Sequence, residues 1–249
     1  MPKIFYGILI SILACILIVF VFKPFDNTTP STEDCSTSTE DTSTELRRDL
    51  PLILLDAGHG GFDPGKVGIN DVLEKDINLA IVQKLKVLLE EYGFQIQLTR
   101  DSDQILGPAN STRPKMDDMI ARVEMVKTLD PFFTVSIHQN SFPDPDVNGP
   151  QVFYYKDSVE SATMAQVIQN ALNQYLEPQK KRVAQSNTNY YLLTRTPTPT
   201  VIVECGFLSN PNEASLLATE EYQNKVAQAI CMGIISYYES IPSTQTPSE

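Results

Sequence analysis

The stretch LILLDAGHGG, residues 52–61, decides how this chain folds. The apolar residues at 52–55 predict a buried strand, and the run then stops in a glycine-rich turn. Gly60 and Gly61 free the backbone to turn and leave room beside the imidazole of His59. The stretch therefore places one histidine on a tight turn at the end of a strand. In open α/β sheets, ligands bind at this edge.

The chain contains 2 histidines, and the second is His138, in the stretch FFTVSIHQN at 132–140. This is again an apolar strand pattern that ends in a histidine followed by polar residues. For either histidine alone, a packed and hydrogen-bonded imidazole is the simpler interpretation. The matching positions of the pair, with a glycine-rich turn beside one of them, favour a metal site.

The composition argues against some classes of partner and of site. The 249 residues carry a formal net charge of -12, which argues against a nucleic-acid partner because phosphates are bound by Lys and Arg. The 4 cysteines include no Cys-x-x-Cys spacing, so they predict neither a cysteine metal site nor a disulfide framework. Cys205 and Cys231 fall in apolar patterns and are predicted to be buried single thiols.

The N-terminal segment at 1–23 reads as a membrane anchor. Residues 4–22 carry no charge and lie between Lys3 and Lys23, and about 20 apolar residues span a bilayer. A cleaved signal peptide is the alternative, but no small-x-small cleavage site ends the run. Both interpretations place the rest of the chain outside the cytoplasmic membrane, anchored or secreted.

The rest of the chain divides by composition. Residues 24–49 are acidic, rich in Ser and Thr and poor in core-forming residues, which predicts a disordered linker. The folded domain is expected at 50–240, and residues 241–249 form a polar tail.

Strand and helix patterns alternate within the predicted domain, which is typical of an α/β fold. We expect a single domain with a mostly parallel, twisted central sheet flanked by helices and preceded by one transmembrane anchor. Strands are predicted at 52–55, 94–100, 132–137, 151–155 and 200–203, and helices at 76–92, 116–129, 162–175 and 220–239.

Two glutamates are candidates for chemistry. A catalytic zinc ion is commonly held by two histidines and one glutamate, and Glu74 could complete such a set. It could equally be a helix-start charge that favours the helix dipole. Glu204 follows an apolar strand pattern, where a carboxylate needs a partner. A structural salt bridge could supply that partner. The sharper alternative is a general base at a cleft, because burial raises the pKa of a carboxylate toward neutrality.

Four ordered motifs carry a family resemblance: LDAGHGG at 55–61, LEKD at 73–76, SIHQN at 136–140 and VECGFLSNP at 203–211. Together they resemble the zinc-dependent N-acetylmuramoyl-L-alanine amidases of the Amidase_3 family. The resemblance implies hydrolysis of the amide between N-acetylmuramic acid and L-alanine in peptidoglycan. It also implies Zn²⁺ as cofactor. Its implied ligands are His59, Glu74 and His138, and its implied catalytic residue is Glu204.

Within this family the chain is most similar to the germination-specific, spore-cortex branch. The similarity lies in GPQVFYY at 149–155, in NPNEASLL at 210–217, and in a lone amidase domain behind an N-terminal anchor. It implies action in cortex maturation, where muramic lactam forms, and a location in the forespore intermembrane space. An accessory regulatory protein that stabilises the zinc site is a further hypothesis. The alternative is a non-catalytic peptidoglycan-binding protein, which would be expected to lose Glu204 or a ligand.

Three residues are candidate substrate contacts. Asn140 follows the second histidine and could hydrogen-bond peptide or glycan. Arg122 could contact the substrate, but a surface charge on the 116–129 helix is the favoured interpretation. Arg195 could meet a peptide carboxylate, or could be a solvated loop arginine.

Overall fold

The computed structural model describes residues 50–242 of the chain. The predicted anchor at 1–23 and linker at 24–49 lie outside these residues, as does almost all of the polar tail. Among the described residues, no helix has both the length and the apolar character needed to cross a bilayer.

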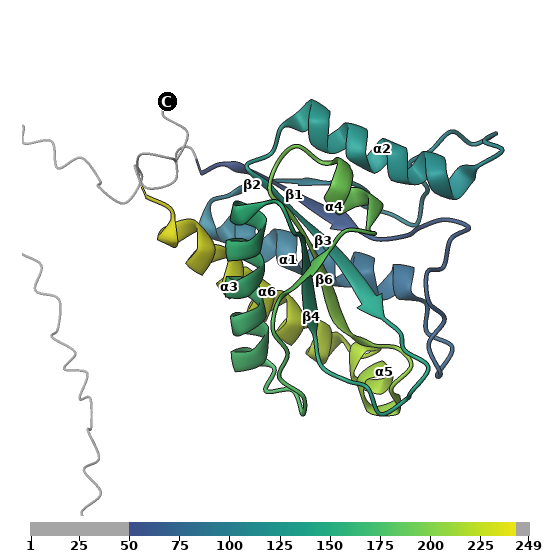
Figure 1. Cartoon of the computed structure of the whole chain (residues 1–249). Coiled ribbons are helices and arrows are strands. Elements are labelled where there is room, and N and C mark those ends of the chain that lie inside the picture. Colours follow the sequence, from purple (N-terminus) through teal and green to yellow (C-terminus); the bar gives the residue numbers. More distant parts are fainter. Residues whose placement is uncertain (1–49, 243–249) are drawn as a thin grey trace, which may run out of the picture. The chain divides into compact units, whose positions relative to one another are not determined.

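A six-stranded sheet in the order β2-β1-β3-β6-β4-β5 forms the centre of the fold (Figure 1). Every neighbouring pair is parallel except β4 and β6, which are antiparallel, so the predicted mostly parallel sheet is confirmed. The strands are β1 (Leu52–Ala57), β2 (Gln95–Leu98), β3 (Phe133–Asn140), β4 (Gln151–Tyr155), β5 (Gln185–Asn187) and β6 (Thr200–Phe207).

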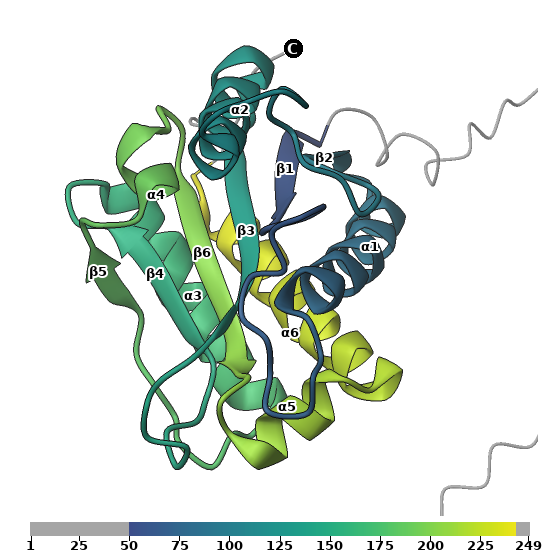
Figure 2. The same ribbon diagram turned by 90° about the vertical axis from the view of Figure 1, so that its right-hand side faces the viewer.

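Helices cover both faces of this sheet. The longer helices α1, α3 and α6 pack together on one face, and α2 and α4 contact each other across the other face (Figure 2). The helices are α1 (Glu74–Tyr92), α2 (Pro114–Leu129), α3 (Val159–Tyr175), α4 (Tyr191–Arg195), α5 (Pro211–Leu217) and α6 (Glu220–Ser240).

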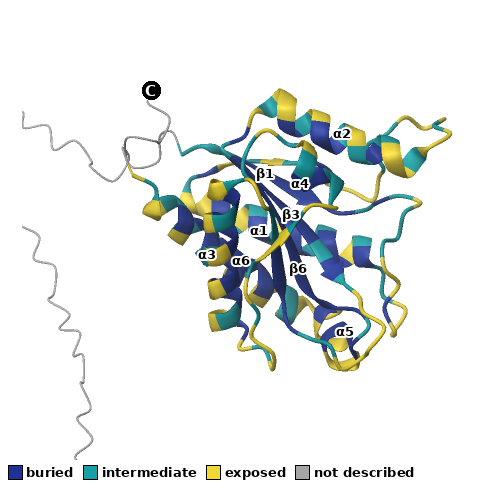
Figure 3. Ribbon diagram, viewed as in Figure 1, coloured by how far each residue is buried: buried dark blue, intermediate teal, exposed yellow. Residues whose placement is uncertain are grey.

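The core lies between the sheet and the layer of α1, α3 and α6. All eight residues of β6 are buried, as is expected for a central strand covered on both faces (Figure 3). The sequence of a parallel strand buried on both faces is a continuous apolar run, and this is why the patterns at 52–55 and 200–203 indicate strands. The buried sheet therefore fixes the positions of the side chains that β1, β3 and β6 carry.

The structure corrects some of the predicted bounds. The strand predicted at 132–137 continues as β3 to Asn140, and the strand predicted at 200–203 continues as β6 to Phe207. His138 and Glu204 therefore lie inside strands, not beyond their ends. Sequence patterns missed β5, α4 and α5 because these elements span only three to seven residues, too few to show a period.

Candidate active site

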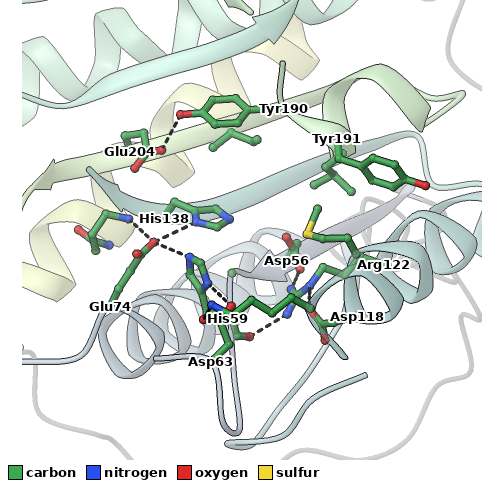
Figure 4. Close-up of a pocket in the computed structure, with 16 residues that line it drawn as sticks. Asp56, His59, Asp63, Glu74, Asp118, Arg122, His138, Tyr190, Tyr191 and Glu204 are labelled. Atoms are coloured by element: carbon green, nitrogen blue, oxygen red, sulfur yellow. Dashed lines mark hydrogen bonds and ion pairs between the residues drawn. The ribbon is translucent and has the colours of Figure 1, made fainter. Parts of the chain in front are cut away.

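A pocket of about 430 Å³ opens where β1, β3 and β6 face the helices α2 and α4 (Figure 4). His59, Glu74, His138 and Glu204 all line it. Four segments that are far apart in the sequence thus meet at one place. The meeting point lies toward the carboxyl ends of the parallel strands β1 and β3, where the sequence predicts a site.

The cluster of His59, Glu74 and His138 has the geometry of a metal site. One potential ligand atom from each residue lies within 4.8 Å of the others. Glu74 Oε1 lies 3.2 Å from His59 Nε2 and 3.0 Å from His138 Nδ1. Two imidazoles and a carboxylate are a donor set that zinc prefers, and the three atoms are close enough to share one ion. The side chains therefore fit the ion that the family resemblance implies.

Glu74 is held in place by its surroundings. It begins α1 and is only 4% exposed. Its Oε2 accepts a hydrogen bond from the backbone N–H of Lys66 at 2.7 Å, and its Oε1 accepts one from that of Gln139 at 3.0 Å. A carboxylate that serves only the helix dipole would not be so enclosed. Glu74 does lie in the first turn of α1, but its enclosed carboxylate also meets both imidazoles, so its role as a ligand stays a prediction.

Two glycines make room for the cluster. A Cβ atom on Gly58 would lie 2.2 Å from His138 Cε1. A Cβ atom on Gly65, which has a φ of +67°, would lie 2.6 Å from both Glu74 Oε2 and His59 Cδ2. Gly60 and Gly61, which were expected to leave this room, face the segment around Gln104 instead. The space beside the imidazoles therefore depends on Gly58 and Gly65.

The cluster also shifts the pKa values of its members. Burial opposes a charged imidazole, but hydrogen bonds to Glu74 and Asp63 raise the pKa of His59 to about 9. Burial would raise the pKa of Glu74, but His138 and His59 hold it well below its usual range. Without a cation, the site therefore pairs a charged carboxylate with a protonated imidazole, and a metal ion would replace that proton.

Asp63 is the residue that orients His59. Its Oδ2 lies 2.8 Å from His59 Nδ1, which leaves His59 Nε2 facing Glu74. Asp56 and Ser136, the neighbours in sequence considered for such a role, hydrogen-bond to each other instead. Ligating histidines usually bond a carboxylate or carbonyl through their second nitrogen. Asp63 was missed from the sequence, although it follows His59 by four residues in the loop after β1.

Glu204 lies on β6 directly opposite His138 on β3. It is 6% exposed, and its Oε2 is a buried oxygen without a hydrogen-bond partner among the described residues. Burial raises the pKa of Glu204 to about 7, with His138 opposing and the charge of Glu74 assisting that rise. A carboxylate of this pKa beside a pocket is suited to accept and return a proton near neutral pH.

Arg122 is not a surface charge, because its side chain is 2% exposed. It forms a buried ion pair with Asp56 and a second one, 2.8 Å long, with Asp118. The sequence could not reveal this, since Asp56 lies 66 residues away in the chain. The favoured interpretation of Arg122 as a solvated helix charge is therefore wrong.

Two buried arginines hold the backbone that carries His59. Arg122 donates hydrogen bonds to the carbonyl oxygens of Ala57 at 2.9 Å and His59 at 2.7 Å. Arg100, which follows β2, donates to those of Ala57 at 2.9 Å and Gly58 at 3.1 Å. His59 itself has a φ of 62°, which is uncommon for a residue other than glycine. The carbonyl contacts offset that strain and fix the turn.

Arg122 lines the pocket, whereas the other two candidate substrate contacts lie outside its walls. Asn140 accepts a hydrogen bond from the backbone N–H of Ser141, and Arg195 is exposed, with its guanidinium 5.8 Å from the ring centre of Tyr191. Substrate binding by these residues stays a prediction.

Cys205 and Cys231 are buried free thiols, as predicted.

The fold and the site are those of a peptidoglycan amidase. Residues 53–236 match the family described as N-acetylmuramoyl-L-alanine amidase, and the chain belongs to this family. It therefore hydrolyses the amide bond between N-acetylmuramic acid and L-alanine. The alternative of a non-catalytic wall-binding protein is not supported, because the cluster and Glu204 are all in place.

Individual relatives agree with this assignment. The chain is 38% identical over 190 residues to the germination-specific N-acetylmuramoyl-L-alanine amidase of Bacillus subtilis, covering 75% of this chain and 79% of the relative. The CwlD amidase of Clostridioides difficile, solved in complex with the GerS lipoprotein, is 38% identical with a TM-score of 0.75. That match covers 77% of this chain and 100% of CwlD. Amidase AmiC2 of Nostoc punctiforme is 34% identical with a TM-score of 0.67, covering 76% and 97%.

Proposed function

We propose that the amidase activity depends on one zinc ion held by His59, Glu74 and His138. The convergence of two imidazole nitrogens and one carboxylate oxygen within 4.8 Å carries this proposal. When bound, zinc supplies Lewis acidity to the scissile carbonyl and lowers the pKa of an attacking water toward about 7. Because Gly58 and Gly65 carry no Cβ atom, these three side chains have the room to lie beside one another.

Glu204 is the general base and acid of the proposed mechanism. Its Oε2, which has no hydrogen-bond partner among residues 50–242, takes the proton from the attacking water, because a carboxylate with a pKa of about 7 is a competent base near neutral pH. The same oxygen then returns the proton to the amine of L-alanine as the amide bond breaks. Asp63 keeps the His59 ring in one orientation, and Glu74 stays charged throughout.

A pair of variants tests these roles separately. Glu204→Ala is expected to keep one zinc per chain and to lose release of peptide from muramic acid, by about 100-fold or more. His138→Ala is expected to lose the zinc itself. Glu124→Ala, which removes an exposed carboxylate from α2, serves as the control and should change neither property. Full turnover by Glu204→Ala with bound zinc would overturn the proposal.

We further propose that the substrate is spore-cortex peptidoglycan, and that the product enters muramic lactam formation. The support is the 38% identity to a germination-specific amidase. Mass spectrometry of muropeptides digested by residues 50–240, with and without added zinc, tests the bond that is cut. Deleting the gene in the host organism is expected to remove muramic lactam from the spore cortex. Spores with normal muramic lactam would contradict the cortex assignment while leaving the amidase activity intact.

An accessory protein is the third element of the proposal. The similar CwlD amidase was solved with a lipoprotein partner, and we propose that a protein of this kind stabilises the zinc site here. Zinc occupancy of the purified domain is expected to be substoichiometric and to rise when the partner is added. Tight, stoichiometric zinc in the isolated domain would show that no partner is needed.

The layout of the chain supports a location outside the cytoplasmic membrane. We propose that residues 1–23 anchor the chain, that residues 24–49 form a linker, and that residues 50–240 reach the wall from the membrane surface. In a sporulating cell this would place the domain in the forespore intermembrane space. Fractionation of cells that produce the full chain or a chain lacking residues 1–23 tests the anchor, which should account for membrane retention.

A further inference from the structure

Among the described residues, Tyr190 is the side chain that donates a hydrogen bond to the carboxylate of Glu204. The phenol oxygen lies 3.3 Å from Glu204 Oε1, and the second oxygen, Oε2, has no partner among the described residues (Figure 4). The two oxygens are therefore not equivalent. One oxygen accepts a hydrogen bond, and the other keeps its lone pairs unused by the described residues.

The position of Tyr190 is itself fixed from two sides. Its backbone N–H donates to Asn187 Oδ1 at 3.0 Å, which orders the short loop between β5 and α4. Its ring packs edge-on against Phe153 of β4, with the centroids 5.4 Å apart and the planes at 82°. An edge-to-face aromatic pair at this separation is favourable. The phenol group is thus aimed by its own packing and not by a flexible loop alone.

Phe153 connects this arrangement to the sheet. It pairs with Ile202 on β6, and its neighbour two residues earlier, Gln151, pairs with Glu204. The ring that supports Tyr190 and the strand that carries Glu204 therefore belong to one antiparallel ladder. The ladder therefore fixes the backbone of Phe153, on whose ring the phenol packs, relative to the backbone of Glu204.

We propose that Tyr190 is a positioning residue for the general base, and this inference rests on the proposed role of Glu204. By holding Oε1, the phenol restricts rotation of the carboxylate about its last side-chain bond. Oε2 is then held in one orientation, from which it can take the proton of the attacking water in the pocket that Glu204 lines. Rates fall steeply when a reacting group is displaced by about 1 Å, so loss of this hydrogen bond should reduce the chemical step more than substrate binding.

The test compares Tyr190 with a tyrosine outside the pocket. Tyr190→Phe removes the hydroxyl and keeps the ring that packs on Phe153. It is expected to lower kcat about 10-fold, with KM changed by less than about twofold and with bound zinc unchanged. Tyr175→Phe removes a hydroxyl from an exposed tyrosine of α3 that does not line the pocket. Its kcat should stay within about twofold of the parent.

A second variant tests whether the backbone support of Tyr190 matters for the reaction. Asn187→Ala removes the acceptor for the Tyr190 backbone N–H and should lower kcat by a smaller factor. In the Tyr190→Phe background it should add almost nothing, because both changes act through one hydroxyl. Additive losses would overturn the proposal. So would a Tyr190→Phe enzyme with normal kcat, or one with raised KM alone, which would make Tyr190 a substrate contact. Glu204→Ala is measured in parallel. Full activity of that variant would refute the role of Glu204 as general base, which is a failure distinct from that of the positioning role of Tyr190.

Discussion

Arg122 on α2 donates a hydrogen bond of 2.7 Å from Nη2 to the carbonyl oxygen of His59. A buried guanidinium thus holds the backbone of a proposed metal ligand, while its other nitrogens pair with the carboxylates of Asp56 and Asp118. The side chain of Arg122 therefore contributes both to the stability of the fold and to the position of His59. Removing it affects both, and the two effects can be measured separately.

The first prediction concerns this arginine. Arg122→Ala leaves Asp56 as a buried charge without its cation, which is expected to cost about 3–5 kcal/mol in the free energy of unfolding. Zinc affinity should fall as well, because the turn that carries His59 loses its support. Denaturant unfolding and metal titration measure the two effects. Lys127→Ala is the control on the same helix, since its pair with Glu124 is exposed and should contribute less than about 1 kcal/mol.

The second prediction concerns Gly58. Gly58→Ala places a Cβ atom 2.2 Å from His138 Cε1, so the imidazole must leave its present position. We expect zinc binding and turnover to fall by about 10-fold or more, because a misplaced ligand cannot complete the set. Gly68→Ala is the control, since its nearest atoms belong to the side chains of Asn70 and Val72 on the loop before α1. Equal zinc affinity in the two variants would refute the steric role of Gly58.

The third prediction is a pH dependence of kcat. Glu204 must be deprotonated to accept a proton, and its pKa is raised to about 7. Activity should therefore decline as the pH falls through this value and level off above it. The groups that face this carboxylate are Glu74, His59, His138 and Tyr190, and a bound cation would add a further lowering effect. The acidic limb is therefore expected at or below about pH 7, and a limb above about pH 8 would contradict the assignment.

The fourth prediction concerns proton release. The pKa of His59 is raised to about 9 without metal, so its ring is protonated at neutral pH and must lose that proton when a metal binds. Calorimetric titration of zinc in two buffers of different ionisation enthalpy should reveal the released proton. Zinc affinity should increase with pH up to about 9. Asp63→Asn should weaken zinc binding by about 10–100-fold and lower the amount of proton released.

The sequence predicts the architecture well because its signals are local. The apolar runs of β1, β3 and β6 are continuous, since these strands are buried on both faces. The motifs around His59, Glu74, His138 and Glu204 also identify the residues that the fold brings together in one pocket.

The supporting residues could not be predicted, because their roles depend on contacts between distant segments. The burial of Arg122 follows from its approach to Asp56, and that of Arg100 from its approach to the turn after β1. Nothing in the pattern of residues around Tyr190 points to Glu204. The five-residue helix α4, whose N-cap is Tyr190, is too short to show a hydrophobic period.

The pairing of His138 with Glu204 across β3 and β6 has a consequence for divergence within the family. Adjacent strands lie about 4.7–4.9 Å apart in every sheet, so the spacing between these two residues is set by the backbone ladder. Insertions in the surrounding loops can reshape the walls of the pocket without altering that spacing. We therefore expect these two residues to keep their separation in family members whose surrounding loops differ in length.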